Sequence, residues 1–152
     1  MRTNSGKAHG IRVRTAKIED AEQIAVLSGQ LGYPASGAGM RRRLRYLLRE
    51  HGQAVWVAET GEGTVAGWIH VFVKQLLESE REAELGGLVV GREFRGQGVG
   101  RALVERAERW AKARRLKSVY VRSNVVRKEA HIFYPRLGYR IIKTQSAFRK
   151  HI

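Results

Sequence analysis

Hydrophobic and polar residues alternate in several short stretches of the chain, and a period of two predicts β-strands. Near the start, Ile11 and Val13 alternate with Arg12 and Arg14. The sequence Gly-Glu-Gly at residues 61–63 predicts a turn between two longer strands. In total, strands are predicted at residues 11–14, 54–59, 64–73, 83–90, 117–122, 139–142 and 144–148.

Other stretches repeat their apolar residues at the three-to-four-residue spacing of an amphipathic helix. Ile24, Leu27 and Leu31 have this spacing, and Gly32 follows them as a stop signal. Helices are predicted at residues 19–31, 40–50, 99–110 and 126–137. Together these elements predict an α+β fold, with a mixed, mostly antiparallel central sheet flanked by helices on both faces.

Length and composition narrow the class of protein. The 152 residues suffice for one domain, which we expect at residues 10–152 after a flexible tail at residues 1–9. No stretch approaches the ~20 apolar residues of a membrane span, and the first residues lack the apolar core of a signal peptide, so we expect a cytoplasmic protein without a membrane partner. The chain has no cysteine, which excludes disulfides, a catalytic thiol and iron–sulfur clusters, and we expect no metal site.

Charge is the least ordinary property of the composition. The chain has 29 Lys and Arg against 14 Asp and Glu, a net charge of +15. Such an excess favours anionic partners, including phosphorylated cofactors and nucleic acid. The run Arg41-Arg42-Arg43 keeps a nucleic-acid-binding module as an alternative function, although the chain lacks zinc-finger spacing and ribonucleoprotein-type aromatic residues. A solvated basic surface would give the same net charge, so charge alone does not show that the protein has an anionic partner.

Residues 88–101 hold the most informative pattern: a strand, then glycines that alternate with other residues, then a helix. The N–H groups in the first turn of a helix have no acceptor within it, and the helix dipole adds positive potential there. Glycine lets a phosphate approach the backbone without obstruction by a Cβ atom. The turn is therefore a candidate anion site. It matches neither a Walker loop nor the dinucleotide fingerprint.

The sequence Arg95-Gly96-Gln97-Gly98-Val99-Gly100 resembles the Arg/Gln-x-x-Gly-x-Gly/Ala acyl-CoA signature of the GNAT N-acetyltransferase superfamily. The family's second signature resembles Ser123-Asn124, Arg127, Ala130-His131 and residues 133–139. The predicted order of elements is also similar to that of the family, so the resemblance extends from residue 11 to about residue 148.

The resemblance implies acetyl-CoA as co-substrate. It implies that the backbone of Leu88, Val89 and Val90 pairs with the pantetheine arm as another strand would. Asn124 is implied to bind near the thioester, while a cap for a helix at Val126 is its alternative role. The pyrophosphate is implied to lie on the backbone amides of Arg95, Gly96, Gln97, Gly98, Val99, Gly100 and Arg101.

The resemblance also implies a proton donor and a proton acceptor. Tyr134 is implied to protonate the leaving thiolate, and packing against the sheet is its alternative role. Glu84, on the strand before the signature, is implied as the base that takes a proton from the amine, with His70 on a neighbouring strand as the alternative. With plain alternation Glu84 shares a face with Leu88, and a bulge near Gly86-Gly87 would reorient it.

Four glutamates at alternating positions bear on the acceptor: Glu78, Glu80, Glu82 and Glu84. In a basic chain this cluster favours a small-molecule cationic amine as substrate, with a solvated loop as the alternative reading. We expect N-acetylation by direct attack in a ternary complex, because no cysteine and no serine in a nucleophile-elbow setting is present to carry the acetyl group. A protein N-terminus or a lysine side chain is the alternative acceptor, and the resemblance is compatible with a homodimer.

Overall fold

The computed structural model describes residues 10–152, so the predicted tail at residues 1–9 lies outside the described residues. Contacts divide the chain into two units, the first ending at Val121 and the second spanning Arg122–Ile152. Within residues 10–152, no helix has the length and apolar character needed to cross a bilayer.

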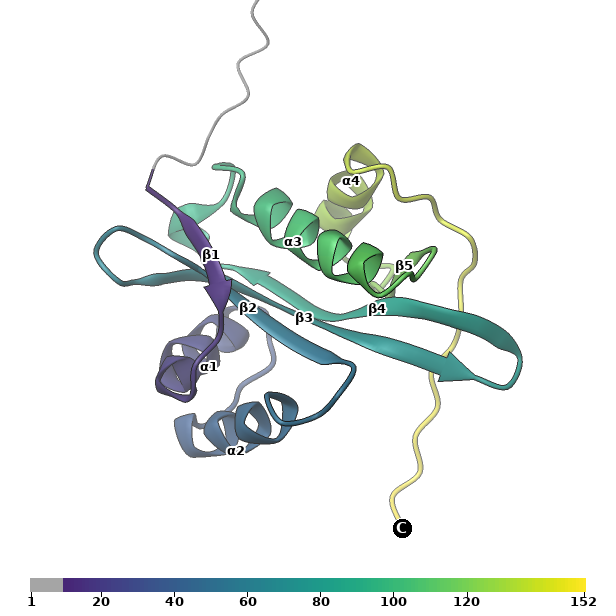
Figure 1. The fold of residues 1–152 in the computed structure, drawn as a ribbon, viewed down its shortest axis with the longest axis horizontal. Coiled ribbons are helices and arrows are strands. Elements are labelled where there is room, and N and C mark those ends of the chain that lie inside the picture. The colour runs from purple at the N-terminus through teal and green to yellow at the C-terminus, as the bar shows by residue number, and fades with distance from the viewer. Residues whose placement is uncertain (1–9) are drawn as a thin grey trace, which may run out of the picture. The chain divides into compact units, whose positions relative to one another are not determined.

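A five-stranded sheet forms the centre of the first unit (Figure 1). Its strands are β1 (Arg12–Thr15), β2 (Gln53–Glu59), β3 (Val65–Leu76), β4 (Ser79–Val90) and β5 (Val119–Val121). They lie side by side in the order β1-β2-β3-β4-β5. All neighbours are antiparallel except β4 and β5, which are parallel. The predicted mixed, mostly antiparallel sheet is confirmed.

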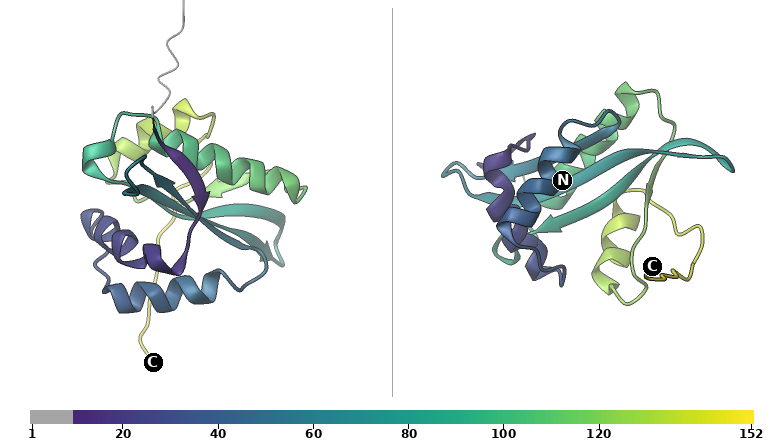
Figure 2. Two further views of the ribbon diagram at one scale, coloured as in Figure 1. Left: turned by 60° about the vertical axis from the view of Figure 1, so that its left-hand side comes forward. Right: turned by 90° about the horizontal axis from the view of Figure 1, so that it is seen from below.

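Helices cover both faces of this sheet, as predicted (Figures 1 and 2). The short 3₁₀ helix η1 (Ile18–Asp20), α1 (Ala21–Gln30) and α2 (Gly37–Leu47) lie on one face, and α3 (Val99–Ala113) lies on the other. Leu103 of α3 is fully buried against β3. A Cβ atom at Gly67 would lie 3.2 Å from Leu103 and 2.7 Å from the carbonyl oxygen of Val89, so the helix packs closely on the strands.

Several elements of the first unit differ from the prediction at their ends. The helix expected at residues 40–50 begins earlier, because the Ser36 hydroxyl accepts a hydrogen bond from the Gly39 N–H and caps α2 at Gly37. The connection expected between residues 73 and 83 is mostly strand, since β3 extends to Leu76 and β4 starts at Ser79. An ion pair between Lys74 and Glu82, 2.8 Å apart, supports this extension across the strands.

The second unit contains the helix α4 (Lys128–Arg136), which begins two residues later than predicted. The strands predicted at residues 139–142 and 144–148 are wrong, because the structure assigns no strand to residues 122–152. Ile141 and Ile142 are each 72% exposed and Phe148 is 95% exposed. An alternating sequence becomes a strand where one face is buried and a neighbouring strand accepts its hydrogen bonds. Neither condition is met for these residues in the described part of the chain.

Candidate active site

The register between β3 and β4 shifts at Gly86. Before the shift Glu84 pairs with Phe72, and after it Leu88 pairs with Ile69, which leaves Gly86 as an extra residue on β4. This is a β-bulge, and it turns Glu84 and Leu88 to opposite faces of the sheet. Of the two arrangements that the sequence left open here, plain alternation and a bulge near Gly86-Gly87, the structure has the bulge.

β4 continues beyond the point where its parallel partner ends. Its pairing with β5 stops at Leu85, whereas its pairing with β3 runs on to Val90. The Gly91 N–H donates to the carbonyl oxygen of Ala66 at 2.8 Å, so alternation points the N–H and C=O groups of Leu88 and Val90 away from β3. Those of Val89 point towards β3 by the same rule. Within residues 10–152, no strand of the sheet pairs with the outer side of this stretch, which has the hydrogen-bonding groups that an extended ligand arm needs.

The segment between β4 and α3 is a glycine-rich turn that contains the short 3₁₀ helix η2 (Arg92–Phe94). Gly96 and Gly98 have φ angles of 74° and 82°, in the left-handed region that favours glycine. Gly98 is the N-cap of α3, and no side chain caps the first N–H groups of that helix. The Arg95 Nε–H donates to the carbonyl oxygen of Val90 at 3.3 Å and braces the turn against β4. The turn therefore has the geometry of an anion site.

Two rings of β3 lie against the bulge. A Cβ atom at Gly86 would lie 2.5 Å from Nδ1 of His70, and one at Gly87 would lie 2.7 Å from Cη2 of Trp68. The rings thus occupy space that glycine leaves open. Nε2 of His70 is hydrogen-bonded to the side chain of Gln53, and burial lowers the pKa of His70 below its ordinary 6.5. The imidazole is therefore neutral near pH 7 and is able to accept a proton.

Glu84 lies on the same face as His70, in a cluster of charges. Its side chain is buried, and Oε2 lies 3.9 Å from Nζ of Lys74. The same ammonium pairs with Glu82 and lies 3.7 Å from the centre of the Tyr120 ring. Two of the four glutamates that the sequence singled out thus share one cation. Within residues 10–152, no three His, Asp or Glu side chains are arranged to hold a metal ion.

Gln53, Lys74 and Tyr120 belong to this face, and the sequence did not single them out. Strand pairing brings them together, because Gln53 pairs with Phe72, Phe72 with Glu84, and Glu84 with Tyr120. The row crosses four strands, so no local spacing reveals it. Lys74 had a usable signal, since it follows His70 by four residues and would share its face in a longer strand.

The second unit holds the other two predicted site residues. Oδ1 of Asn124 accepts a hydrogen bond from the Val126 N–H at 3.1 Å, which leaves its amide N–H groups available. This turn precedes α4, whose N-cap is Arg127. The ring of Tyr134 meets the rings of Phe133 and Tyr139 edge-on, at 5.0 Å and 5.6 Å between centres. Burial raises the pKa of Tyr134 to about 12, so its phenol keeps its proton at neutral pH.

Known protein families provide an independent comparison. A model of the Acetyltransferase (GNAT) family matches residues 19–139. An uncharacterized N-acetyltransferase from Chlorobaculum tepidum is 29% identical over 133 residues, which is 88% of this chain and 77% of that protein. N-acetylaspartate synthetase from Danio rerio is 30% identical over 95 residues, or 62% of this chain. The chain spans only 32% of the length of that zebrafish protein.

Solved structures of low sequence identity share the fold. AAC(6')-Ih, an aminoglycoside antibiotic 6'-N-acetyltransferase from Acinetobacter baumannii, has a TM-score of 0.81 at 18% identity, over 94% of this chain and 99% of that one. AAC(6')-Iy, solved in complex with the bisubstrate analogue CoA-S-monomethyl-acetylneamine, has a TM-score of 0.81 at 17% identity, over 93% of this chain and 99% of that one.

Proposed function

This chain belongs to the GNAT acetyltransferase family, and we propose that it transfers the acetyl group of acetyl-CoA to a primary amine on a small cationic acceptor. One observation carries the proposal. The outward backbone groups of Leu88 and Val90 lead into the glycine turn, where the first N–H groups of α3 lack a side-chain cap. An extended arm that pairs with β4 brings its diphosphate to this turn. The fold neighbour solved with a CoA-containing bisubstrate analogue supports this choice of donor.

The amine attacks the thioester carbonyl directly, and the Leu88 N–H stabilises the developing oxyanion. Side-by-side binding of the two reactants supplies much of the acceleration, up to roughly 7–11 kcal/mol for ideal alignment. No acetyl-enzyme forms, because the chain has no cysteine and no serine in a nucleophile-elbow setting.

We assign proton removal from the amine to the face that carries His70. This residue pairs with Gly87, directly beside Leu88. Glu84 stands four residues from Leu88 on β4, which is about 13 Å along an extended strand. Lys74 already lies beside the Glu84 carboxylate, whereas Gln53 holds Nε2 of His70 and leaves Nδ1 to accept a proton. Glu84, the base expected from the family, is the second candidate.

Tyr134 is the proposed acid for the leaving thiolate, on the resemblance of its segment to the family's second signature. A phenol that stays protonated at neutral pH suits this role, since it has a proton to donate when the C–S bond breaks. The amide N–H groups of Asn124 are proposed to bind the donor near its thioester end.

A small cationic amine remains the proposed acceptor. The exposed carboxylate of Glu78 attracts such a molecule. Lys74 neutralises much of the charge of Glu82 and Glu84, and four cations lie around Glu80. A fold neighbour named for aminoglycoside antibiotics, which are polyamines, supports this class of acceptor.

The proposal is tested by release of coenzyme A thiol from acetyl-CoA against a panel of amines. The panel contains aminoglycosides, linear polyamines, a peptide with a free N-terminus and an N-blocked peptide with one lysine. We expect turnover with small polyamines. Turnover with the peptides alone would move the acceptor to protein, and calorimetry that detects no binding of acetyl-CoA would overturn the proposal.

A further inference from the structure

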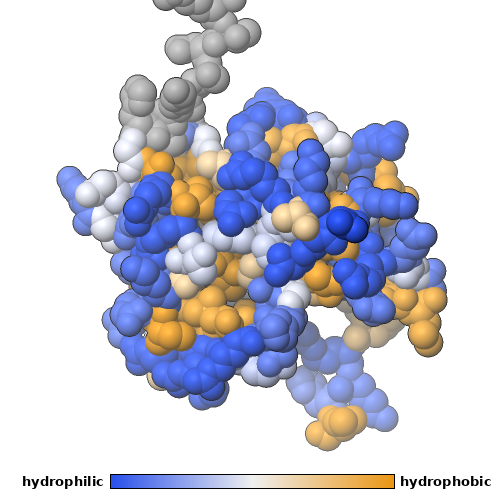
Figure 3. Space-filling model, viewed as in Figure 1, coloured by the Kyte–Doolittle hydropathy of each residue, from blue (hydrophilic) through white to orange (hydrophobic). Residues whose placement is uncertain are grey.

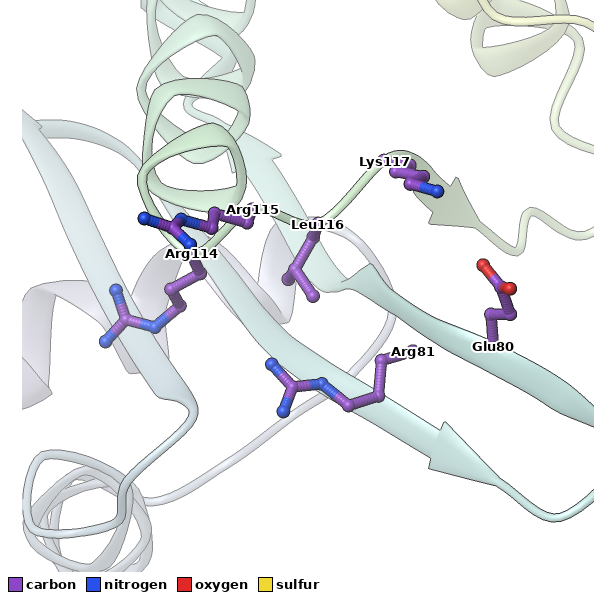
Figure 4. Close-up of a pocket in the computed structure, with 6 residues that line it drawn as sticks. All are labelled: Glu80, Arg81, Arg114, Arg115, Leu116 and Lys117. Atoms are coloured by element: carbon purple, nitrogen blue, oxygen red, sulfur yellow. The ribbon is translucent and has the colours of Figure 1, made fainter.

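The C-terminal end of α3 borders a hollow of about 530 Å³ in the first unit (Figure 4). Two segments build it: the start of β4 and the loop that joins the end of α3 to β5. It is lined by Glu80, Arg81, Arg114, Arg115, Leu116 and Lys117. We refer to this hollow as the α3-end pocket. Its volume lies within the range of sites for small ligands, roughly 300–1,000 Å³.

Charge sets this pocket apart from the rest of a basic molecule. Hydrophilic residues cover much of the face in Figure 3. Because the chain has 29 Lys and Arg residues, exposed basic side chains alone do not mark a site. In the α3-end pocket, however, four of the six lining residues are cationic and only Glu80 carries a negative charge. Within residues 10–152, no salt bridge joins any of these four cations to a carboxylate. The pocket therefore has an excess of positive charge that an anionic ligand would neutralise.

The backbone conformation of Arg115 is a second, independent indication that this pocket binds a ligand. Arg115 has a φ of 58°, and within residues 10–152 it is the only non-glycine residue with a positive φ. It closes α3 in a motif where the Leu116 N–H donates to the carbonyl oxygen of Ala111 at 3.1 Å. Glycine is the residue that suits this position. A long cation at a position that favours glycine indicates that its side chain has a role other than ending the helix.

A neighbouring arginine is held in place by a ring. The guanidinium of Arg114 lies 4.1 Å from the centre of the Trp110 ring, a cation–π contact that restricts its motion. Figure 4 shows the guanidinium groups of Arg81, Arg114 and Arg115 on one side of Leu116 and Lys117 on the other. One guanidinium group can donate two parallel hydrogen bonds to the oxygens of a phosphate. Three such groups favour a ligand with several phosphate oxygens over a simple carboxylate.

From these observations we infer that the α3-end pocket binds a small anion that carries two or more phosphate groups. The site is separate from the glycine turn, because α3 has 15 residues and the two lie at its opposite ends, about 22 Å apart. The inference is independent of the proposed acetyl transfer. The small number of cations at the site favours a small polyphosphate over nucleic acid, which needs an extended basic surface.

The test is a titration of the protein with inorganic tripolyphosphate. Binding is measured from the changes in the amide chemical shifts in NMR spectra. Arg115→Gly and Arg81→Gln remove cations from the pocket. Arg109→Gln removes the same charge from an exposed position on α3 outside the pocket. We expect shifts around residues 114–117 and at least tenfold weaker binding in the two pocket variants, with wild-type affinity in Arg109→Gln. Arg115→Gly should keep or raise the melting temperature, because glycine suits the backbone there.

The inference would be overturned by absence of binding, by equal losses in all three variants or by shifts confined to the glycine turn. Tighter binding of a short single-stranded DNA, with wild-type affinity in Arg115→Gly, would also overturn it. Acetyl-CoA turnover of Arg115→Gly is measured alongside. If the proposed acetyl transfer is wrong, the wild-type protein shows no turnover. If this inference is wrong, tripolyphosphate does not bind at the pocket and the turnover of the wild-type protein is unaffected.

Discussion

The Nε2 atom of His70 lies 2.6 Å from Oε1 of Gln53. Because the amide oxygen accepts a hydrogen bond, Nε2 carries the imidazole proton and Nδ1 is left as the basic nitrogen. The ring lies against Gly86, at the bulge that redirects β4 before Leu88. One side-chain contact from β2 thus sets which nitrogen of a β3 residue faces β4.

Replacement of His70 by Gln should lower kcat by roughly 100-fold, because a positioned general base contributes about 10²–10⁴. Burial lowers the pKa of His70, so in the wild type the acidic limb of kcat/KM should lie below pH 6.5. The measurement is the pH profile of thiol release for the wild type, His70→Gln and Glu84→Gln. A normal profile in His70→Gln, with the large loss in Glu84→Gln, would assign the base to Glu84 instead.

Gly86→Ala should destabilise the fold by about 1–3 kcal/mol, the usual cost of overpacking. The new Cβ atom would lie 2.5 Å from Nδ1 of His70, so the ring must move and activity should fall as well. Urea unfolding and thiol release measure the two effects. Gly61→Ala is the matched control, since a Cβ atom there meets nothing within 4 Å. Equal stability of the two variants would contradict the close contact at the bulge.

Much of the first unit could be predicted from local patterns. Val99, Leu103 and Ala107 repeat at helical spacing, and all three are buried in α3. The paired glycines at Gly86 and Gly87 are compatible with the bulge in β4, which the sequence left open as an alternative to plain alternation. These signals are short-range: each depends on residues within one turn of helix or one pair of strand positions.

The errors arise where structure depends on distant partners. The row from Gln53 to Tyr120 requires the register of four strands, which no window of sequence contains. The strands expected after residue 138 failed for the same reason, because alternation marks a strand only when a neighbour is available to pair with it.

Gly96→Ala should weaken acetyl-CoA binding at least about tenfold, equivalent to about 1.4 kcal/mol. The φ of 74° at Gly96 is strained for alanine, and relaxation would reorient the amides of the turn. Gly63→Ala is a close control, because Gly63 has a φ of 83° and, like Gly96, open space around it. Both variants should lose about 1–2 kcal/mol of stability. Calorimetry should detect weaker acetyl-CoA binding in Gly96→Ala alone, and equal affinities would remove the turn from the donor site.

Tyr134→Phe should lower kcat by roughly 100-fold and leave the affinity for acetyl-CoA unchanged, since only the phenolic proton is lost. Burial raises the pKa of Tyr134 to about 12, so its ionisation should not reduce the wild-type rate below pH 10. Tyr139→Phe is the control, because Tyr139 is a neighbouring tyrosine with a ring in contact with Tyr134. Single-turnover thiol release is the measurement. Similar rates in both variants would argue for a packing role at Tyr134.

Asp20→Asn should destabilise the protein by about 3–5 kcal/mol at pH 7, the usual effect of breaking a buried pair. Arg14 binds both carboxylate oxygens of Asp20 at 2.8 Å, and the two side chains are 13% and 7% exposed. Burial by itself would raise the pKa of Asp20, but the hydrogen bonds from Arg14 and the Lys17 N–H outweigh it and hold that pKa below 3.8. The unfolded chain therefore takes up this proton first, and the contribution of Asp20 to stability is lost as the pH falls below about 3.8.

Urea unfolding between pH 7 and pH 3 measures this effect, and Asp20→Asn should lose less stability over that range than the wild type. Glu22→Gln is the control, because Glu22 and Arg41 form an exposed pair 3.2 Å apart, with 75% and 41% exposure. Such a pair contributes about 0–1 kcal/mol, so its loss should change little at any pH. If the two substitutions cost the same, the bidentate contact between Arg14 and Asp20 does not anchor η1 to β1.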